Sequence, residues 1–377
     1  MLLLYNAYMK DTDLLKEIEP ILSSAYESHM DSIQDRSNKD TTKRPFSPVE
    51  VLAKSAQTST DPLEYGPILR SDFKQHIQDF EIDYGIDIKP IIMSSFLINL
   101  LTEDNLPHYT SRIHSKVAGS EALMLFANEW TAEEDTHGVL MRDYALLSGL
   151  IGDEQTSLIS NASYQKGRTN QLRSGTEINP TSLQSAFAYL SLQELLTNEA
   201  HKTEGWILPA SGRKIMNPIA GDEQNHYEFY RTATQASLDT DPDGTLIAIN
   251  NTFSNFSMPG ALGIPDFNNQ ALTIGLSGIF DLETIAKSMH TIAQKLNIKD
   301  TEPNTDAGKT AKENILQNTS TEAVEQKHQL MQRLRSSMEV KLNKNGLLPF
   351  ILGKTIDFDY AGSAEHQKPV GLKPLSD

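Results

Sequence analysis

The stretch WTAEEDTHG, residues 130–138, decides the fold that this sequence predicts. It belongs to a segment with helical spacing, and residues three positions apart in a helix project from nearly the same face. Glu134 and His137 can therefore bind one shared object. The spacing recurs downstream, where GDEQNH pairs Glu223 with His226. Two such pairs raise the hypothesis that both segments bind metal at a common site.

Two further glutamates stand at positions that helical periodicity assigns to the core. Glu103 lies in the apolar segment 88–106 and Glu194 in the segment 181–200, so the order along the chain is Glu, Glu-x-x-His, Glu, Glu-x-x-His. This order is the ligand set of ferritin-like di-iron carboxylate bundles. Two ferrous ions cancel the charge of four carboxylates, which would otherwise repel one another in a core of low dielectric constant. Mixed carboxylate and imidazole ligands suit iron or manganese better than copper or magnesium.

A third Glu-x-x-His pair, Glu325 with His328, shows that the spacing alone is weak support for a metal site. Its neighbours are polar all round the helix, which is typical of a solvated face with a local ion pair. We therefore leave this pair out of the predicted metal-ligand set. That set comprises Glu103, Glu134, His137, Glu194, Glu223 and His226.

The composition is that of an ordinary soluble protein and excludes several kinds of function. The 377 residues include 38% hydrophobic and 22% charged side chains, and the net charge of −17 argues against nucleic acid as a partner. The chain contains no cysteine, which rules out disulfides and thiolate-bound iron–sulfur clusters or haem. It also contains no G-x-G-x-x-G motif and no P-loop, so any redox reaction must receive its electrons from outside the chain.

No transmembrane segment is expected from the sequence. The longest apolar segment, residues 90–101, is too short to cross a bilayer and is typical of a buried helix. The N-terminus turns polar soon after Leu4, which argues against a secretory signal, and the lack of cysteine fits a reducing compartment. We therefore expect a cytoplasmic protein.

Hydrophobic periodicity predicts an all-α chain, because helical spacing recurs throughout and no run alternates strongly enough to be a strand. The predicted helices cover residues 13–33, 88–106, 121–148, 181–200, 213–238, 245–257, 266–278, 281–296 and 307–342. Proline-rich or polar stretches predict an extended segment at 34–70, a loop at 152–179, a connection at 202–212, a linker at 300–308 and a loose tail at 360–377. We expect one domain over residues 1–297, followed by a polar helix and tail over residues 298–377.

Short stretches outside the metal-ligand set agree with one protein family. The matching stretches are NLLTEDNLP at 99–107, WTAEE at 130–134 with His137 and Gly138, Gln193-Glu194 with Thr197, Asp222-Glu223 with His226, DPDGT at 241–245, SMPG at 257–260, GIP at 263–265 and GIFDL at 278–282. On these residues the chain resembles the soluble acyl-acyl carrier protein desaturases, in particular their actinobacterial members. The resemblance extends from about residue 10 to residue 297. It implies a ferritin-like helical bundle with a four-helix di-iron core and additional flanking helices.

The resemblance also implies a role for each site residue. Glu134 and Glu223 would bridge two iron ions. Glu103 and His137 would complete the coordination of one ion, and Glu194 and His226 that of the other. Asp222 would accept a hydrogen bond that orients a ligand histidine, as metal-bound imidazoles usually require. Thr197 matches a threonine thought to help oxygen and proton handling in the family, and a threonine bonded to its own helix backbone is an equal alternative.

The implied reaction is the O2-dependent introduction of a cis double bond into a saturated acyl chain held on acyl carrier protein. Two Fe2+ ions would be the cofactors, a ferredoxin-type protein would donate electrons, and the enzyme would be a homodimer. The apolar faces of helices 88–106 and 181–200 would line a deep channel that keeps water from the acyl chain. Two alternatives stay open: a ferritin-like relative that binds two metals or acyl carrier protein without desaturating, and a di-iron hydroxylase or N-oxygenase.

Two features depart from the family pattern. RPFSP, residues 44–48, stands where relatives have a proline–tryptophan segment, and Phe46 has no N–H donor for a hydrogen-bonded electron route. The net charge is also unfavourable for docking an acidic carrier protein, so docking requires a local basic patch. The candidates for this patch, each of which taken alone is more often ordinary solvated surface, are Arg142, Lys166, Arg168, Arg173, Lys202, Arg213 and Lys214.

Overall fold

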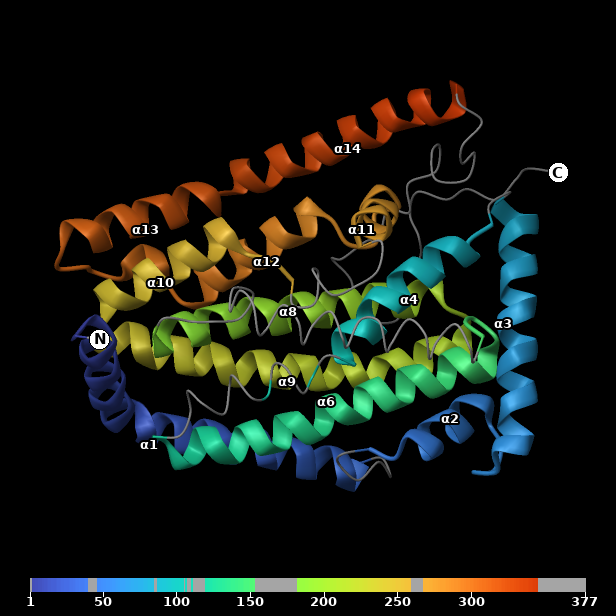
Figure 1. The fold of residues 1–377 in the computed structure, drawn as a ribbon, viewed down its shortest axis with the longest axis horizontal. Coiled ribbons are helices and arrows are strands. Elements are labelled where there is room, and N and C mark those ends of the chain that lie inside the picture. Colours follow the sequence, from blue (N-terminus) through green and yellow to red (C-terminus); the bar gives the residue numbers. More distant parts are fainter. Residues whose placement is uncertain are drawn as a thin grey trace.

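The computed structural model describes residues 2–39, 46–84, 87–104, 106, 110, 119–152, 182–258 and 267–344. Every regular element within these residues is helical, which confirms the predicted all-α class (Figure 1). The elements are α1 (Leu2–Lys39), α2 (Pro48–Ala56), α3 (Pro62–Tyr84), α4 (Lys89–Glu103), α6 (Glu121–Ser148), α8 (Leu183–Ile207), α9 (Ala210–Thr240), α10 (Pro242–Asn255), α11 (Phe267–Leu276), α12 (Leu282–Lys295), a 3₁₀ turn (Ile298–Asp300), α13 (Asp306–Asn318) and α14 (Thr321–Lys344).

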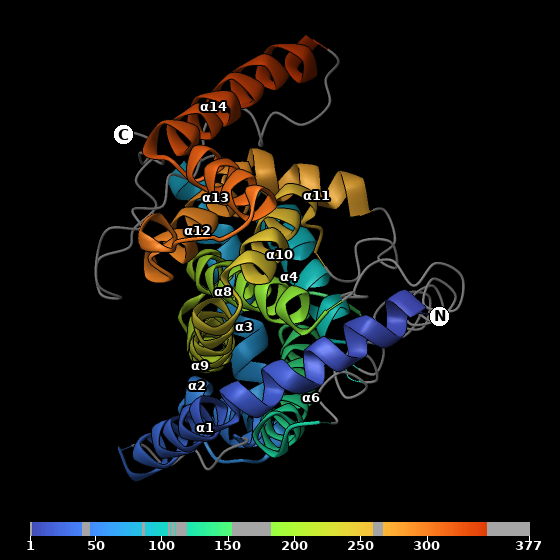
Figure 2. The same cartoon turned by 90° about the vertical axis from the view of Figure 1, so that its left-hand side faces the viewer.

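The four helices that carry the predicted metal ligands, α4, α6, α8 and α9, form the centre of the molecule (Figure 1). α8 and α9 run side by side, and α4 and α6 pack against this pair. α1 covers α6 and α9, whereas α10 and α12 pack on α8 from the other side (Figure 2). α14 is the outermost helix and packs on α12 and α11. A four-helix core with flanking helices is the predicted ferritin-like arrangement.

Two buried apolar clusters lie at opposite ends of the central helices. One includes Tyr144 of α6 and Ile215 of α9, together with residues of α2, α3 and α4. The other includes Phe126 of α6 and Phe229 of α9, together with residues of α1 and α8. Burial of this apolar surface stabilises the bundle by roughly 25 cal/mol per Å2. The predicted metal ligands fall between the two clusters along α6, α8 and α9, so packing at both ends fixes the polar band in the middle.

The hairpin between α8 and α9 is tighter than the sequence predicted. The predicted connection over 202–212 is wrong, because only Leu208 and Pro209 separate the two helices. The turn depends on close packing at Gly212, where an added Cβ would lie 2.6 Å from Tyr144 Oη and 2.7 Å from Leu208 Cβ. A glycine is therefore required here for space, and it lets the last turn of α8 and the first turn of α9 approach closely.

Two other predicted boundaries are also wrong. The extended segment predicted for residues 34–70 contains all of α2 and residues 62–70 of α3. Pro48 and Pro62 are the first residues of these helices, where a missing N–H costs no helical hydrogen bond, so they mark helix starts rather than loops. The helix predicted over 307–342 is divided into α13 and α14. Ser320 begins the second helix by accepting a hydrogen bond from the N–H of Ala323 at 3.1 Å.

The helices after residue 297 lie against the rest of the bundle. α13 packs on α10, and α14 packs on α12 and α11. The division of the chain at residue 297 stays a prediction. The predicted loop at 152–179 and the tail at 360–377 lie outside the described residues, apart from Gly152. Among the described helices, none is long and apolar enough to cross a membrane.

Candidate metal centre

Each of the four central helices brings its predicted ligands to one buried point. α4 contributes Glu103 as its last residue, and α8 contributes Glu194 from its middle. α6 contributes Glu134 and His137, and α9 contributes Glu223 and His226. None of the six side chains is more than 8% exposed. Capping serines fix where two of these helices begin, since Ser120 caps α6 and Ser182 caps α8 through their hydroxyl groups.

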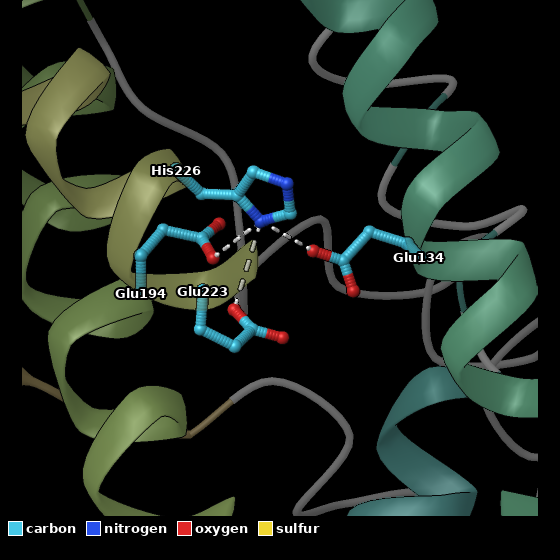
Figure 3. A group of neighbouring side chains, drawn as sticks. All are labelled: Glu134, Glu194, Glu223 and His226. Carbon is cyan, nitrogen blue, oxygen red and sulfur yellow. Dashed lines mark ion pairs between the residues drawn. The ribbon is translucent and has the colours of Figure 1, made fainter. Parts of the chain in front are cut away.

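The distances between the six side chains are short enough for shared metal ions. His226 Nδ1 lies 3.2 Å from Glu134, 3.5 Å from Glu194 and 3.7 Å from Glu223 (Figure 3). His137 Nδ1 lies 3.5 Å from Glu134 and 3.4 Å from Glu223. Glu103, Glu134 and His137 likewise offer ligand atoms that all lie within 4.8 Å of one another. The structure thus brings all six predicted residues together, with Glu134 and Glu223 in contact with both histidines.

The outer nitrogen of each histidine binds a carboxylate from the opposite helix. His137 Nε2 on α6 lies 3.2 Å from Asp222 Oδ2 on α9, which is the contact expected for Asp222. His226 Nε2 on α9 lies 2.8 Å from Glu133 Oε2 on α6. A carboxylate acceptor keeps the proton on Nε2 and turns the Nδ1 lone pair towards the glutamates. The sequence analysis gave Glu133 no role, although Glu133 and Asp222 each immediately precede the glutamate of a Glu-x-x-His pair.

Two further side chains hold carboxylates of the cluster in place. The hydroxyl of Thr197 donates to Glu223 Oε2 at 2.9 Å and also lies 3.2 Å and 3.1 Å from the carbonyls of Gln193 and Glu194. Both alternatives considered for Thr197 are therefore compatible with its position. Trp130 Nε1 donates to Glu194 Oε1 at 3.2 Å. Trp130, the first residue of the opening stretch, thus helps to orient a glutamate from another helix.

His201 is a site residue that the sequence analysis missed. Its Nε2 lies 3.6 Å from Glu103 and 3.7 Å from Glu223, and the side chain is buried. Burial lowers the pKa of His201 to about 4, which keeps the imidazole neutral. Glu103, His201 and Glu223 form another group whose atoms could hold a metal ion. The sequence feature that could have identified His201 is its spacing of four residues from Thr197 and seven from Glu194. This spacing places all three residues on one face of α8.

The carboxylates cannot all be charged at once without a compensating charge. Burial, followed by the charges of Glu134 and Glu223, raises the pKa of Glu103 well above its usual range. Burial and the charge of Glu223 do the same for the pKa of Glu194. Burial would also raise the pKa of Glu223, but the adjacent imidazoles of His137 and His226 lower it well below its usual range. The site therefore favours cations at its centre, either protons or metal ions.

The inward-facing atoms fit a pair of divalent metal ions. Five of them are buried and make no well-formed hydrogen bond within the described part of the chain: Glu134 Oε1, His137 Nδ1, Glu194 Oε2, Glu223 Oε1 and His226 Nδ1. Buried polar atoms of this kind are rare unless water or an ion satisfies them. Carboxylate oxygens and neutral imidazole nitrogens are ligands that suit iron or manganese.

Phe46, the residue at the departure from the family pattern, lies directly against the site. Its ring is 3% exposed and stacks on the imidazole of His137, with ring centroids 6.0 Å apart and an interplanar angle of 21°. The contact shields His137 from water. A phenyl ring has no hydrogen-bond donor, so it cannot extend the chain of hydrogen bonds from Asp222 and His137 outward.

The third Glu-x-x-His pair takes no part in this site. His328 on α14 binds Glu283 of α12, with Nδ1 2.8 Å from the carboxylate oxygen. The local ion pair predicted with Glu325 is wrong, since Glu325 accepts a hydrogen bond from Gln329 instead. His328 therefore connects two flanking helices.

Comparisons with known proteins identify relatives of the chain. The fatty acid desaturase family profile matches residues 48–344 of the chain. DesA1 of Mycobacterium tuberculosis, provisionally named an acyl-[acyl-carrier-protein] desaturase, is 27% identical over 286 residues, which are 73% of this chain and 75% of DesA1. The chloroplastic stearoyl-[acyl-carrier-protein] 9-desaturase 6 of Arabidopsis thaliana is 30% identical over 162 residues, or 40% of each chain. The X-ray structure of DesA2 from M. tuberculosis, provisionally described as an acyl-ACP desaturase, matches at 15% identity with a TM-score of 0.43, covering 66% of this chain and 98% of DesA2.

Proposed function

Because the chain belongs to the fatty acid desaturase family, we propose that it is an acyl-acyl carrier protein desaturase that introduces a cis double bond into a saturated acyl chain. The observation that carries the proposal is the buried cluster of four glutamates and two histidines with unsatisfied inward-facing atoms. Each double bond would consume one O2, two electrons and two protons, and would release two water molecules.

Two iron ions would be held by the six residues predicted from the sequence. Glu134 and Glu223 would contact both ions, since each lies near both histidines. Glu103 and His137 would serve one ion, and Glu194 and His226 the other. Bound ferrous iron would supply the reduction of O2 that removes hydrogen from two neighbouring carbons of the acyl chain. Asp222 and Glu133 would keep each ligand imidazole in the required tautomer, as their contacts with Nε2 indicate.

An apolar cavity beside the cluster is suited to the acyl chain. It has a volume of about 450 Å3, which lies within the range of small-molecule sites. Its walls include Thr102, which precedes Glu103, and Ala200, which precedes His201. The cavity is therefore lined by two of the helices, α4 and α8, that carry the proposed iron ligands. The channel walls predicted on helices 88–106 and 181–200 are represented by α4 and by Ala200 alone of α8. Most of the remaining wall comes from α11, α12, α14 and the residues between α11 and α12.

The proposed partners are acyl carrier protein, a ferredoxin-type electron donor and a second copy of this chain. Several basic residues proposed for carrier docking already have partners. Arg142 pairs with Asp104, Lys202 with Glu199, and the guanidinium of Arg213 lies 4.0 Å from the centre of the Trp206 ring. Lys214 is exposed, whereas Lys166, Arg168 and Arg173 lie outside the described residues. Among the described candidates, these contacts favour Lys214 as the residue that docks the carrier protein.

The decisive test is an assay of the iron-loaded protein with reduced ferredoxin, its reductase, O2 and a series of saturated acyl-acyl carrier proteins. We expect an O2-dependent product that is lighter by two hydrogen atoms, detected by mass spectrometry. The variant Glu134→Ala should form no such product, whereas Glu325→Gln should behave as the wild type. A hydroxylated product would instead identify a hydroxylase. Tight iron binding with no product from any chain length would identify a metal-binding relative without desaturase activity.

A further inference from the structure

The acyl-sized cavity opens to solvent at a rim of exposed leucines. Leu272 of α11, Leu282 of α12 and Leu334 of α14 all line the cavity, and they are 48%, 43% and 40% exposed. Large apolar side chains grouped at one opening usually mark a place where an apolar ligand or partner binds. The lining also includes Thr102 of α4 and Ala200 of α8. The cavity thus has an apolar rim on three flanking helices and is also lined by α4 and α8, two of the helices that carry the proposed iron ligands.

α14 contributes to the cavity as well as to the rim. Met331 lines the cavity and is 5% exposed, so its side chain is enclosed between α14 and the helices beneath it. Met331 and Leu334 lie three positions apart and therefore share one face of the helix. Without these two side chains, one wall of the cavity would be missing.

Polar contacts on the same face hold α14 in position. The guanidinium of Arg335 donates to the carbonyl oxygen of Gly275 at 3.0 Å and also pairs with Asp281. The side chains of Arg335 and Asp281 are 11% and 5% exposed, so water screens this pair weakly. His328 adds its contact with Glu283 one turn before Met331. Gly275 and Asp281 also line the cavity, so Arg335 fixes α14 directly to the cavity wall.

We propose that α14 forms one side of the entrance to the acyl-binding cavity, with Met331 and Leu334 in contact with the acyl chain and Arg335 as the residue that positions them. This inference rests on the proposed function, because it takes a long saturated acyl chain as the occupant. The lining is apolar except for a few side chains such as Ser95 and Asn99, which favours such a chain over a polar ligand. The polar carrier end of the substrate would stay outside the leucine rim.

Binding of palmitoyl-pantetheine, measured by isothermal titration calorimetry, tests the proposal without requiring turnover. Met331→Trp should fill the entrance and weaken binding at least tenfold. Leu334→Ala should weaken binding several-fold, since each buried methylene contact is worth about fourfold in affinity. Arg335→Ala should also weaken binding, whereas the matched control Arg333→Ala, an exposed arginine on the same helix, should not. Unchanged thermal unfolding and iron content of each variant would show that the bundle remains folded.

Photo-crosslinking gives a second measurement that does not depend on the variants. A palmitoyl-pantetheine carrying a diazirine on a carbon close to the thioester should label the peptide that contains Met331 and Leu334 in the wild-type protein. Wild-type affinity in both Met331→Trp and Arg335→Ala, or labelling confined to α4 and α8, would overturn the proposal even if desaturation is observed. Weakened binding with labelling of α14 would support it even if the desaturase assay gives no product, so the two hypotheses can fail separately.

Discussion

At the scale of single residues, the crosswise contacts of Glu133 and Asp222 are the feature that organises the metal centre. Each carboxylate binds the histidine of the other helix, so α6 and α9 each orient a ligand that the other carries. Neither contact could form if one helix were rotated on its axis. Through these two carboxylates, the position of α6 relative to α9 determines the direction in which the imidazole lone pairs point.

Removing these acceptors should weaken metal binding. We expect Glu133→Gln and Asp222→Asn each to lower the affinity for Fe2+ by about 10–100-fold, because the ligand histidine then donates to a neutral amide instead of a charged carboxylate. Anaerobic titration with Fe2+ measures the change. Glu325→Gln, the same substitution at an exposed glutamate of α14, is the matched control and should leave the affinity unaltered. Equal affinities for Glu133→Gln and the control would show that Glu133 only packs beside His226.

Glu204 should make stability depend on pH. It is fully buried and accepts a hydrogen bond from Asn99 at 2.5 Å. Burial raises the pKa of Glu204 to about 8 from 4.5, a shift that the hydrogen bond from Asn99 opposes. Between these two pH values the folded protein holds a proton that the unfolded chain has lost, so the free energy of unfolding falls as pH rises. The full loss is reached above about pH 8.

The variant Glu204→Gln isolates this effect. It keeps a neutral side chain that can still accept a hydrogen bond from Asn99 but cannot ionise. Urea unfolding at a series of pH values should show the wild type losing a few kcal/mol relative to the variant between pH 4.5 and about 8, with no further divergence above that range. Parallel stability curves for the two proteins would mean that Glu204 ionises normally in the folded state.

At the scale of secondary-structure elements, the α8–α9 hairpin sets the spacing of the two helices that carry Glu194, Glu223 and His226. Gly212→Ala places a methyl group within 2.6 Å of Tyr144 Oη and 2.7 Å of Leu208 Cβ. Tyr144 is fully buried and cannot move aside without displacing its neighbours. We expect a loss of about 1–3 kcal/mol in the free energy of unfolding, as for other overpacked cores.

A second glycine provides the control for this prediction. An added Cβ at Gly275 of α11 would meet only the carbonyl oxygen of Phe280, at an ordinary distance of 3.7 Å. Gly275→Ala should therefore be neutral or slightly stabilising, because alanine has the higher helix propensity. Urea unfolding compares the two variants directly. Similar stabilities would show that the hairpin relaxes around the new methyl group.

At the scale of the whole molecule, the metal centre should couple to global stability. The four central helices converge on one cluster, so a bound ion should link all of them and favour the folded state by about 2.7 kcal/mol at a 100-fold excess over its dissociation constant. Because burial and neighbouring carboxylates raise the pKa of Glu103 and Glu194, metal must displace protons there. The stabilisation should consequently shrink as pH falls.

Thermal unfolding with and without a chelator checks this coupling. Iron loading should raise the melting temperature of the wild-type protein, and chelation should reverse the rise. Glu134→Ala, which loses a carboxylate that contacts both histidines, should respond much less. An equal response in Glu134→Ala would remove Glu134 from the ligand set.

The four-helix core was predictable because its signals are local. Periodic apolar residues and the two Glu-x-x-His pairs predicted α4, α6, α8 and α9 to within a few residues at most of their ends. The helices α2 and α3 were missed because Pro48 and Pro62 resemble loop residues unless their place in the first turn is recognised. The start of α14 at Ser320 was missed although a capping serine is a local signal.

The sequence by itself determined the helical class, the ligand types and the faces from which they project, because these follow from residue identity and a period of 3.6 residues. Only the tertiary structure decided that Glu133 would bind His226 and that His201 would contact both Glu103 and Glu223. It also decided that α14 would line one side of the cavity. Each of these contacts joins residues far apart in the chain. They depend on how the helices are rotated and shifted against one another, which is settled by the packing of side chains over the whole bundle.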